Sequence, residues 1–249
     1  MSNSGAGSDD PGRLYEIRKT IADKYALRRF YEAVYERYQA CLDECPHDGL
    51  AIELGSGAGF ARERIPELIT TDVIEYAGLD RVVDATAMPF GDQSLRAIFG
   101  LNVFHHIPDP EAFLREAQRC LKVGGRVLLV DQHPGLLGKP ILRYVHHEPF
   151  DDQVPQWKFE STGPLSDANG ALAWIVFRRD AARLAEIVPR LECLGYRPHT
   201  PLGYWMAGGL KSWSLVPRWA YPASTALDRL LLSVSKDLGC FVDIELVKR

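Results

Sequence analysis

Four groups of residues in this chain have types and spacings that could bind or activate a ligand. The first is the stretch Glu53-Leu54-Gly55-Ser56-Gly57-Ala58-Gly59, where three glycines on alternate positions follow a carboxylate. Glycines let a ligand approach the backbone closely, and the N–H groups of a helix that starts after such a turn point towards the ligand. The other three groups follow along the chain, and they are Asp72 with Asp84, His105 with His106, and His146 with His147 and Glu148.

The spacing of the three glycines distinguishes between two classes of nucleotide ligand. A dinucleotide fingerprint requires G-x-G-x-x-G, whereas here the third glycine comes one residue early, at Gly59, and Phe60 holds the dinucleotide position. A carboxylate at Glu53 would repel a pyrophosphate and suits a ligand that carries positive charge. We therefore expect a cationic nucleotide-like ligand, and a nucleotide-dependent oxidoreductase is the least favoured function.

Two aspartates that follow strand-like runs could bind the rest of a nucleoside. Asp72 comes near the end of the run Leu68–Val73, 17 residues after the first glycine. A carboxylate at the end of a second strand can accept two hydrogen bonds from a ribose diol. Asp84 follows the short run Val82-Val83. A helix or turn cap is the competing role for Asp84, and Asp80 is a competitor for the role of either aspartate.

The spacing of apolar residues predicts the elements that must position these groups. Strands are predicted at 50–54, 68–73, 82–83, 97–103, 126–131, 195–202 and 241–247, and helices at 62–68, 111–121, 180–191 and 227–238. The nearly unbroken apolar run at 126–131 indicates a strand buried on both faces, and the period-two alternation at 241–247 indicates a last strand near an edge. Strands that alternate with helices indicate an α/β fold, which gathers ligand-binding side chains at the carboxyl ends of its strands.

The residues before the glycine stretch predict a helical cap. Apolar and aromatic residues recur at helical spacing between residues 13 and 43, which indicates one or two amphipathic helices. Two roles stay open: the helices could cover one edge of the sheet, or they could form a lid in which Tyr25, Arg28 or Tyr31 reaches the ligand. The expected organisation is a disordered tail at 1–12, the helical cap at 13–46, and a main domain at 47–249 with an acceptor-side insertion at 132–178.

Composition and charge exclude several other classes of protein. The 249 residues are 46% hydrophobic and 25% charged, with a net charge of −4 and a sequence pI near 6.0. No dense run of lysine and arginine occurs, so we expect a globular protein with no nucleic-acid partner. The five cysteines are odd in number and scattered, so we expect reduced thiols, no metal site and a cytoplasmic location. Neither a signal peptide nor a transmembrane segment is predicted, and the oligomeric state stays open.

Four motifs between residues 50 and 131 together resemble the class I S-adenosylmethionine-dependent methyltransferases of type 11, the group similar to enzymes of ubiquinone and menaquinone biosynthesis. The motifs are E-x-G-x-G-x-G from Glu53, D-A-x-x-M-P-F from Asp84, H-H-I-x-D-P from His105 and L-K-x-G-G from Leu121. One departure is Val123, where such proteins usually have proline, and a loop change of this kind leaves the resemblance intact.

The resemblance implies a doubly wound, mostly parallel, seven-stranded Rossmann-like sheet with helices on both faces and an antiparallel last strand beside the fifth. It implies S-adenosylmethionine as the cofactor, whose ammonium and sulfonium suit the carboxylate of Glu53. It also assigns Asp84 to the adenine amino group and the next backbone N–H to the ring nitrogen. The cofactor-binding residues expected on this basis are Glu53, Gly55, Ser56, Gly57, Gly59, Asp72, Val73, Asp84, Ala85 and Asn102.

Methyl transfer to an oxygen or nitrogen also requires a group that removes a proton from the acceptor. The candidates at the carboxyl ends of strands are His105, His106, His133, His146, His147 and Glu148. We favour His146 or His147 as the base, with Glu148 orienting it, because the surrounding segment is too long and too aromatic for a connector. We expect His106 to pack against or cap the helix that follows it.

The acceptor is predicted to be a small molecule with a hydroxyl group, such as a sugar or a lipid-linked sugar. The segment Tyr204–Gly209 with Trp213, Trp219 and Tyr221 suits stacking on sugar rings or packing against a lipid tail, although an apolar core edge has the same composition. The motifs H-H-E-P-F, G-P-L-S-x-A-N-G-A and G-G-L also resemble methyltransferases found among bacterial surface-polysaccharide functions. The alternative function is a catalytically silent homologue, which would bind S-adenosylmethionine but lack a working base.

Overall fold

The computed structural model describes residues 12–163 and 167–249. The tail expected at 1–12 lies outside the described residues apart from Gly12, and so do Pro164, Leu165 and Ser166 of the G-P-L-S motif. The strands are β1 (Leu50–Leu54), β2 (Leu68–Asp72), β3 (Arg81–Val82), β4 (Leu95–Leu101), β5 (Leu121–Gln132), β6 (Leu191–His199) and β7 (Phe241–Lys248). The α-helices are α1 (Gly12–Asp23), α2 (Tyr25–Asp43), α3 (Ala61–Arg64), α4 (Pro110–Cys120), α5 (Gly138–Tyr144), α6 (Leu172–Trp174), α7 (Ala181–Ile187), α8 (Gly203–Met206) and α9 (Tyr221–Val234), with shorter turns η1 (Phe104–His106), η2 (Ile175–Arg179), η3 (Arg218–Ala220) and η4 (Lys236–Leu238).

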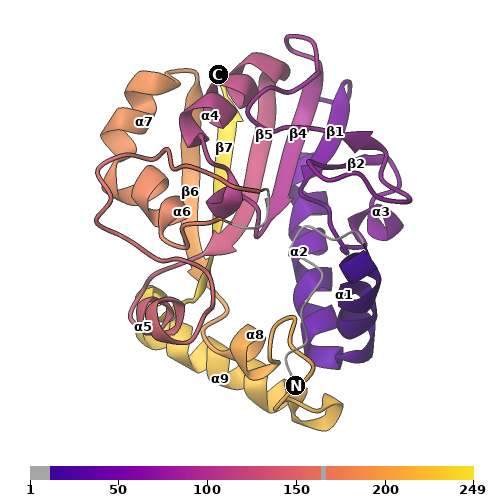
Figure 1. Ribbon diagram of the computed structural model, residues 1–249, viewed down its shortest axis with the longest axis vertical. Coiled ribbons are helices and arrows are strands. Elements are labelled where there is room, and N and C mark those ends of the chain that lie inside the picture. Colours follow the sequence, from indigo (N-terminus) through magenta and orange to yellow (C-terminus); the bar gives the residue numbers. More distant parts are fainter. Residues whose placement is uncertain (1–11, 164–166) are drawn as a thin grey trace.

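The seven strands form one sheet in the order β3-β2-β1-β4-β5-β7-β6 (Figure 1). Strand β7 is antiparallel to both β5 and β6, and the other neighbouring pairs are parallel. The predicted doubly wound fold with an antiparallel last strand beside the fifth is therefore confirmed. The strand order reverses between β1 and β4, and open α/β sheets bind their ligands at the carboxyl ends of strands at such a point.

Helices cover the two faces of the sheet in two separate apolar layers. Ile52 and Leu54 of β1 belong to a core that includes residues of α4, α6, η2 and α7, whereas Ala51 belongs to a core that includes α2. On that second face the ring of Tyr38 in α2 stacks on Phe99 in β4, with centroids 4.5 Å apart. Because successive side chains point to opposite faces of a strand, Glu53 lies on the α2 face with Ala51.

Strand β7 is the second strand from the edge, and its polar residues are buried in ion pairs. Its alternating sequence predicts a strand near an edge, but β6 pairs with its outer side and most of its side chains are buried. Asp243 lies 3.2 Å from Arg37 Nε and 3.0 Å from His199 Nε2, while Glu245 pairs with Arg197 at 2.5 Å. The period-two pattern therefore reflects charged partners on the α2 face and not an exposed face.

The helix after the glycine turn is shorter than the sequence predicts. We expect a helix at 62–68, but α3 covers only Ala61–Arg64 and strand β2 already begins at Leu68. Pro66 explains the difference, because a proline disfavours the helical conformation of the residue before it and removes a backbone donor. The two N-terminal helices are confirmed as α1 and α2, separated at Lys24.

Further helices lie beyond the carboxyl ends of the parallel strands. Figure 1 shows α5, α8 and α9 at the end of the sheet towards which β5 runs, with α1 and α2 beside them. Helices α2 and α8 are in direct contact, and so are α8 and α9. Within residues 12–163 and 167–249, every helix is too short or too polar to cross a membrane.

Candidate functional site

The glycine turn after β1 is shaped by its neighbours on both sides. Gly55 has a φ of +60°, and a Cβ there would lie 2.5 Å from Val103 Cγ2, so a side chain is excluded. A Cβ on Gly59 would lie 2.7 Å from the hydroxyl oxygen of Tyr35, which also accepts a hydrogen bond from Phe60 N at 3.0 Å. At Gly57 a Cβ would meet nothing closer than 3.8 Å, so the turn is open on this side. The turn therefore packs tightly against β4 and α2 and leaves room only above Gly57.

Glu53 is a buried carboxylate without a protein counter-charge in contact. It is 3% exposed, and its Oε2 has no hydrogen-bond partner within the described residues. Burial raises the pKa of Glu53 to about 8, the hydroxyl of Ser56 lowers it, and the charge of Asp72 adds to the rise. Burial raises the pKa values of Tyr31, Tyr35 and Tyr38 in α2, and the charge of Glu53 adds to the rise. A buried carboxylate of this kind favours a cationic ligand, because a cation would remove most of the cost of ionising it.

Asp72 holds the glycine turn from the end of β2. Its Oδ2 accepts a hydrogen bond from Gly57 N at 3.1 Å, and its Oδ1 accepts one from Ile74 N, also at 3.1 Å. Burial raises the pKa of this carboxyl, while the two backbone donors lower it. Each carboxylate oxygen keeps a second lone pair, so Asp72 can still accept hydrogen bonds from a diol. Val73 follows it with a half-exposed side chain.

Asp84 lies beside Asp72 because β3 continues the sheet next to β2. Val83 N donates a hydrogen bond to Asp72 O at 2.8 Å, which sets Asp84 one residue further along. The Asp84 carboxylate is exposed and accepts hydrogen bonds from Thr86 N at 2.8 Å and Thr86 Oγ1 at 2.7 Å, through a single oxygen, Oδ1. The turn-cap role is thus real, and Oδ2 stays available for an adenine amino group. Ala85 follows it with a partly buried side chain.

Asp80, the competitor for both roles, has other partners. Its carboxylate binds Arg62 at 2.5 Å and accepts hydrogen bonds from Thr70 N at 3.0 Å and Thr70 Oγ1 at 2.9 Å. These contacts lower the pKa of Asp80 in spite of its partial burial. Asp80 therefore ties β2 to α3.

Asn102 occupies an uncommon backbone conformation where the strand order reverses. It directly follows β4, has a φ of +53°, and its N–H donates to Val130 O at 2.8 Å. Its Oδ1 is buried without a hydrogen-bond partner in the described part of the chain. Left-handed residues other than glycine often mark ligand sites, because strain of this kind persists only where the surroundings impose it.

The N-terminal helices cover the turn with aromatic side chains. Tyr31 is buried against Phe60, with centroids 6.1 Å apart, and Arg28 lies 5.9 Å above the Phe60 ring. Tyr25 contacts Tyr221 of α9 edge to face at 5.3 Å. Helix α2 thus covers a face of the sheet and not an edge, and it also contacts the turn after Glu53, while the role of a lid stays a prediction.

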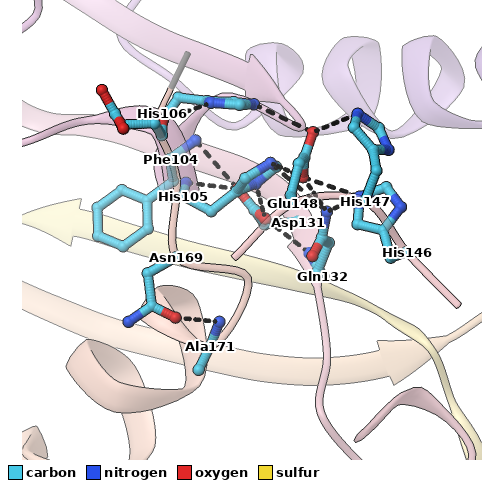
Figure 2. A network of polar contacts seen from close by, with 11 residues as sticks. Phe104, His105, His106, Asp131, Gln132, His146, His147, Glu148, Asn169 and Ala171 are labelled. Carbon is cyan, nitrogen blue, oxygen red and sulfur yellow. Dashed lines mark hydrogen bonds and ion pairs between the residues drawn. The ribbon is translucent and has the colours of Figure 1, made fainter. Parts of the chain in front are cut away.

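Four of the histidines expected to act as a base lie around Glu148 (Figure 2), and the fifth, His133, lies apart from them. Three of these histidines contact the carboxylate of Glu148 through Nε2. His105 Nε2 lies 3.2 Å from Oε2, and His146 Nε2 lies 2.8 Å from the same oxygen. His106 Nε2 lies 3.6 Å from Oε1. His147 Nε2 is 4.0 Å from Oε1, and its side chain is 72% exposed. His133 is separate, since it contacts the hydroxyl of Tyr196 at 2.8 Å.

A second carboxylate, that of Asp131, binds His105 in this cluster. His105 is buried and its Nδ1–H donates to Asp131 Oδ1 at 2.6 Å, while Phe104 N donates to Asp131 Oδ2 at 3.0 Å. Burial disfavours the charged imidazole, but Asp131 and Glu148 outweigh it and raise the pKa of His105 to about 10. Burial would raise the pKa of Glu148, but its histidine hydrogen bonds hold it far below its usual range.

His106 does not cap the helix that follows it, which is one of the two roles expected for this residue. Its Nδ1 contacts the carbonyl oxygen of Asp167 at 3.1 Å, and the cap of α4 is Asp109, which accepts a hydrogen bond from Ala112 N at 3.0 Å. Sequence reasoning also missed Asp131 and Gln132 as members of the cluster. Their position at the carboxyl end of a fully buried strand is the signal that could have found them.

Aromatic rings connect the glycine turn with the histidine cluster. Phe30 of α2 lies 4.9 Å from the ring of Tyr204 in α8, and the neighbouring Trp205 lies 5.4 Å from His146. The segment Tyr204–Met206 is thus a wall between the two parts of the site. Trp219 is 84% exposed and Trp213 is half exposed, so these two rings are not part of the core.

Not all of the segment expected on the acceptor side faces the site. His146, Glu148 and Gln132 do belong to the cluster described above. Trp157 is buried instead in the core that includes α4 and α7, where its Nε1 donates to Asp180 at 2.8 Å. The run Leu172–Phe177 is buried in the same core. This part of the segment therefore stabilises the fold.

Comparison with known proteins agrees with this geometry. The model of a family described as a methyltransferase domain, Methyltransf_11, matches residues 52–129. The 27-O-demethylrifamycin SV methyltransferase of Amycolatopsis mediterranei is 41% identical over 59 residues, which are 24% of this chain and 20% of that protein. Methyltransferase GfsG of Streptomyces halstedii is 32% identical over 80 residues, or 30% of this chain and 28% of that one. The chain thus matches between a fifth and a third of the length of these relatives.

The fold has a relative among solved structures. The geranyl diphosphate C-methyltransferase of Streptomyces coelicolor A3(2), solved with Mg²⁺, geranyl diphosphate and S-adenosyl-L-homocysteine, superposes with a TM-score of 0.51 at 19% identity. The superposition covers all of this chain and 89% of that one. Residues 52–129 thus match a methyltransferase domain of type 11, and the sheet in which they lie has the fold of this solved methyltransferase.

Proposed function

We propose that this protein transfers a methyl group from S-adenosylmethionine to a hydroxyl group of a small molecule, a sugar or a lipid-linked sugar. The observation that carries the cofactor is the buried carboxylate of Glu53, whose Oε2 lacks a partner among the described residues at a turn open above Gly57. The ammonium of the cofactor is the group that such a carboxylate would bind most favourably. A dinucleotide would bring a pyrophosphate to the same place, where Glu53 and Asp72 would repel it.

The other expected residues fit the remaining parts of the cofactor. Asp72 and Val73 would bind the ribose, Asp84 and Ala85 would bind the adenine, and Asn102 would offer its unpartnered Oδ1 at the end of β4. Gly55, Ser56, Gly57 and Gly59 would form the floor beneath it. When bound, S-adenosylmethionine supplies a methyl group already activated by its sulfonium. The chain then has to position an acceptor and exclude water, which is where most of the rate enhancement of such a transfer arises.

The acceptor would lose its proton at the histidine cluster. His147 is the candidate that geometry favours, because it is exposed next to Glu148, whereas Nε2 of His146 is directed at the Glu148 carboxylate at 2.8 Å. His146 and Glu148 would then hold the local structure and orient His147. An imidazole within hydrogen-bond reach of the acceptor hydroxyl can act as its general base.

Two observations support a hydroxyl on a sugar or lipid-linked acceptor. The relative from Amycolatopsis mediterranei is named for methylating a demethylated oxygen of rifamycin SV. The helices beyond the carboxyl edge also expose apolar side chains, among them Tyr144 of α5, Leu230 and Val234 of α9, and Trp219 before α9. An exposed apolar surface next to a site suits a ligand with a large apolar part.

Two experiments test this proposal in order. Calorimetry should show binding of S-adenosylmethionine and S-adenosylhomocysteine with dissociation constants near 1 μM, about −8 kcal/mol, and none of NAD. Metabolites of cells with and without the protein should then differ by one methyl group on a hydroxylated compound, which is offered to the purified protein for confirmation. Tight NAD binding without a response to S-adenosylhomocysteine would refute the cofactor. Cofactor binding without transfer to any compound found would instead favour the catalytically silent homologue.

A further inference from the structure

Three side chains of the cluster at Glu148 direct metal-ligand atoms at one another. The Nε2 atoms of His105 and His106 and a carboxylate oxygen of Glu148 all lie within 4.8 Å of one another (Figure 2). His105 and His106 lie in the turn η1 that follows β4, and Glu148 lies in the loop after α5. Figure 2 shows both imidazole rings pointing towards the Glu148 carboxylate from one side. The cluster is largely shielded from solvent, since His105 is 1% exposed and the side chain of His106 is 13% exposed.

Contacts on the far side of each ring fix its orientation. His105 donates from Nδ1 to Asp131 Oδ1 at 2.6 Å, and His106 donates from Nδ1 to the carbonyl oxygen of Asp167 at 3.1 Å. Since both acceptors require a proton on Nδ1, the second nitrogen of each neutral ring presents a lone pair towards Glu148. A carboxylate or carbonyl behind a ligating histidine is the usual arrangement around a protein-bound metal ion.

Hydrogen bonds from neighbouring side chains also fix the orientation of the Glu148 carboxylate. His146 Nε2 donates to its Oε2 at 2.8 Å, and Gln132 Nε2 donates to the same oxygen at 3.1 Å. Both donors bind Oε2, whereas His106 contacts the other oxygen, Oε1. His146 and Gln132 therefore fix the orientation of the carboxylate from outside the proposed ligand set.

The charge and ligand atoms of this cluster suit a divalent cation. With each Nδ1 donating to its own partner, the two Nε2 lone pairs and the Glu148 carboxylate face one another, and a cation between them attracts all three. Its charge of two also matches the two carboxylates Glu148 and Asp131.

We propose that His105, His106 and Glu148 bind a divalent transition-metal ion of the zinc type. Zinc bonds of about 2.0–2.1 Å in a tetrahedral site place neighbouring ligand atoms about 3.4 Å apart. The two histidine nitrogens here lie 3.2 Å and 3.6 Å from oxygens of Glu148. Two imidazoles with one carboxylate select zinc, cobalt or nickel over magnesium and calcium, which prefer oxygen ligands only.

Three protein ligands leave a fourth position open, as in catalytic zinc sites. If the proposed function holds, this position would receive the acceptor hydroxyl, and His147 would lie beside it. This role in catalysis rests on the proposed function, but metal binding itself does not. A direct measurement of binding therefore separates the two proposals.

The test uses the full-length protein, purified through an affinity tag without histidine, stripped with EDTA and freed of the chelator. Zn²⁺ or Co²⁺ is then titrated by calorimetry, and the visible absorption of Co²⁺ reports the number and kind of ligands. We expect one equivalent of either ion to bind with micromolar affinity or better, and Mg²⁺ to give no signal. Glu148→Gln and His106→Ala should each weaken the binding by about 100-fold or more, since loss of an outer partner alone costs 10–100-fold.

Two matched controls keep the result interpretable. His47→Ala removes an exposed histidine between α2 and β1, and His147→Ala removes one that is adjacent to the ligand set but outside it. Both should bind Zn²⁺ as the unaltered protein does. Retained S-adenosylhomocysteine binding or an unchanged circular dichroism spectrum shows that a variant is folded.

Three results would overturn the metal site. The unaltered protein could bind neither Zn²⁺ nor Co²⁺. Binding could persist undiminished in both Glu148→Gln and His106→Ala. It could also disappear in His47→Ala, which would identify a surface site. In any of these cases the cluster is an ion-pair network of imidazolium rings and carboxylates.

Discussion

Replacing Glu53 with glutamine should stabilise the empty protein and weaken binding of the cofactor. Replacing a residue that only supports the fold would instead destabilise the empty protein. Glutamine has nearly the shape of the neutral carboxylic acid, so the burial of polar atoms is almost unchanged. What the substitution removes is the ionisation that burial opposes, because the pKa of Glu53 is raised to about 8 by that burial.

The magnitude follows from this pKa and from the pKa of about 4.3 of an unperturbed glutamate. The folded protein holds a proton on Glu53 that the unfolded chain loses between about pH 4.3 and pH 8, so this group costs stability as the pH rises through that window. At pH 7 the cost is about 3.5 kcal/mol, and at pH 5 it is about 1 kcal/mol. Glu53→Gln should therefore raise the melting temperature at pH 7 by roughly 7–14 °C, at 2–4 °C per kcal/mol for a chain of this size. The gain should fall to roughly 2–4 °C at pH 5.

Cofactor binding should change in the opposite direction. The ammonium of S-adenosylhomocysteine requires ionised Glu53, so its affinity for the unaltered protein should rise between pH 6 and pH 8, by at most about tenfold per pH unit. In Glu53→Gln that pH dependence should be lost and the affinity at pH 8 should fall by about tenfold or more, since removing one partner of a buried charge pair costs about 2–5 kcal/mol. Adenosine, which has no ammonium, should bind both proteins with dissociation constants that agree within about twofold.

Glu32→Gln is the matched control for these measurements. Glu32 is also buried, but Arg29 at 2.5 Å and Arg64 at 2.6 Å pair with its carboxylate. Burial would raise the pKa of Glu32, and the hydrogen bonds from Arg29 and Arg28 lower it instead. Its substitution should therefore lower the melting temperature at pH 7 and leave the affinity for S-adenosylhomocysteine unchanged. If Glu53→Gln destabilises the protein at every pH, or weakens the binding of adenosine as much as that of S-adenosylhomocysteine, the ligand role of Glu53 is refuted.

Three further predictions concern other parts of the site. Asp84→Asn should weaken the binding of adenosine and of S-adenosylhomocysteine by equal factors in calorimetry, because it alters an adenine contact. Unequal losses of affinity would mean that the aspartate has another role. His147→Ala should lower the methyl-transfer rate by roughly 10²–10⁴-fold and leave S-adenosylmethionine affinity within about 0.5 kcal/mol; an unchanged rate on the true acceptor would place the base elsewhere. Gly55→Ala should abolish cofactor binding and cost about 3 kcal/mol in urea unfolding, because its Cβ would lie 2.5 Å from Val103 at a φ of +60°. The control Gly78→Ala, at a φ of +91° with open space around it, should cost only about 1–2 kcal/mol and leave binding intact.

Local sequence patterns predicted the sheet because each strand carries its own signal. The apolar run before Gly55 and the three glycines that begin there fix a strand, a turn and the face on which Glu53 lies, all within a few residues. The Pro66 effect on α3 is equally local and could have been foreseen. The antiparallel placement of β7 beside β5 came from the resemblance, since nothing in the alternation at 241–247 distinguishes an edge strand from an internal strand with ion-paired side chains.

The histidine cluster could not be predicted in full, because its contacts join distant residues. His105 meets Asp131 only because β4 and β5 pair in the register Leu101 to Val130, which sets the ends of both strands side by side. Glu148 reaches the cluster through a loop without a periodic pattern, so no spacing rule could place it near His106. The sequence therefore indicated the residue types that matter and associated Glu148 with His146 and His147, whereas the structure also brings it to His105 and leaves His147 further away.

The position of β7 between β5 and β6 has a consequence for how the protein folds. The chain between Gln132 at the end of β5 and Phe241 at the start of β7 is 108 residues long, and β6 is synthesised within it. Until β7 arrives, β6 has no partner in the sheet, and the apolar edge of β5 at Val127–Val130 is open to incorrect pairing with other chains. Sheet closure over so long a separation is slow, because the entropy of the intervening chain must be lost before the new contacts form. Slow synthesis at reduced temperature, or a chaperone that covers the β5 edge, should therefore increase the yield of correctly folded protein more than any change near the glycine turn.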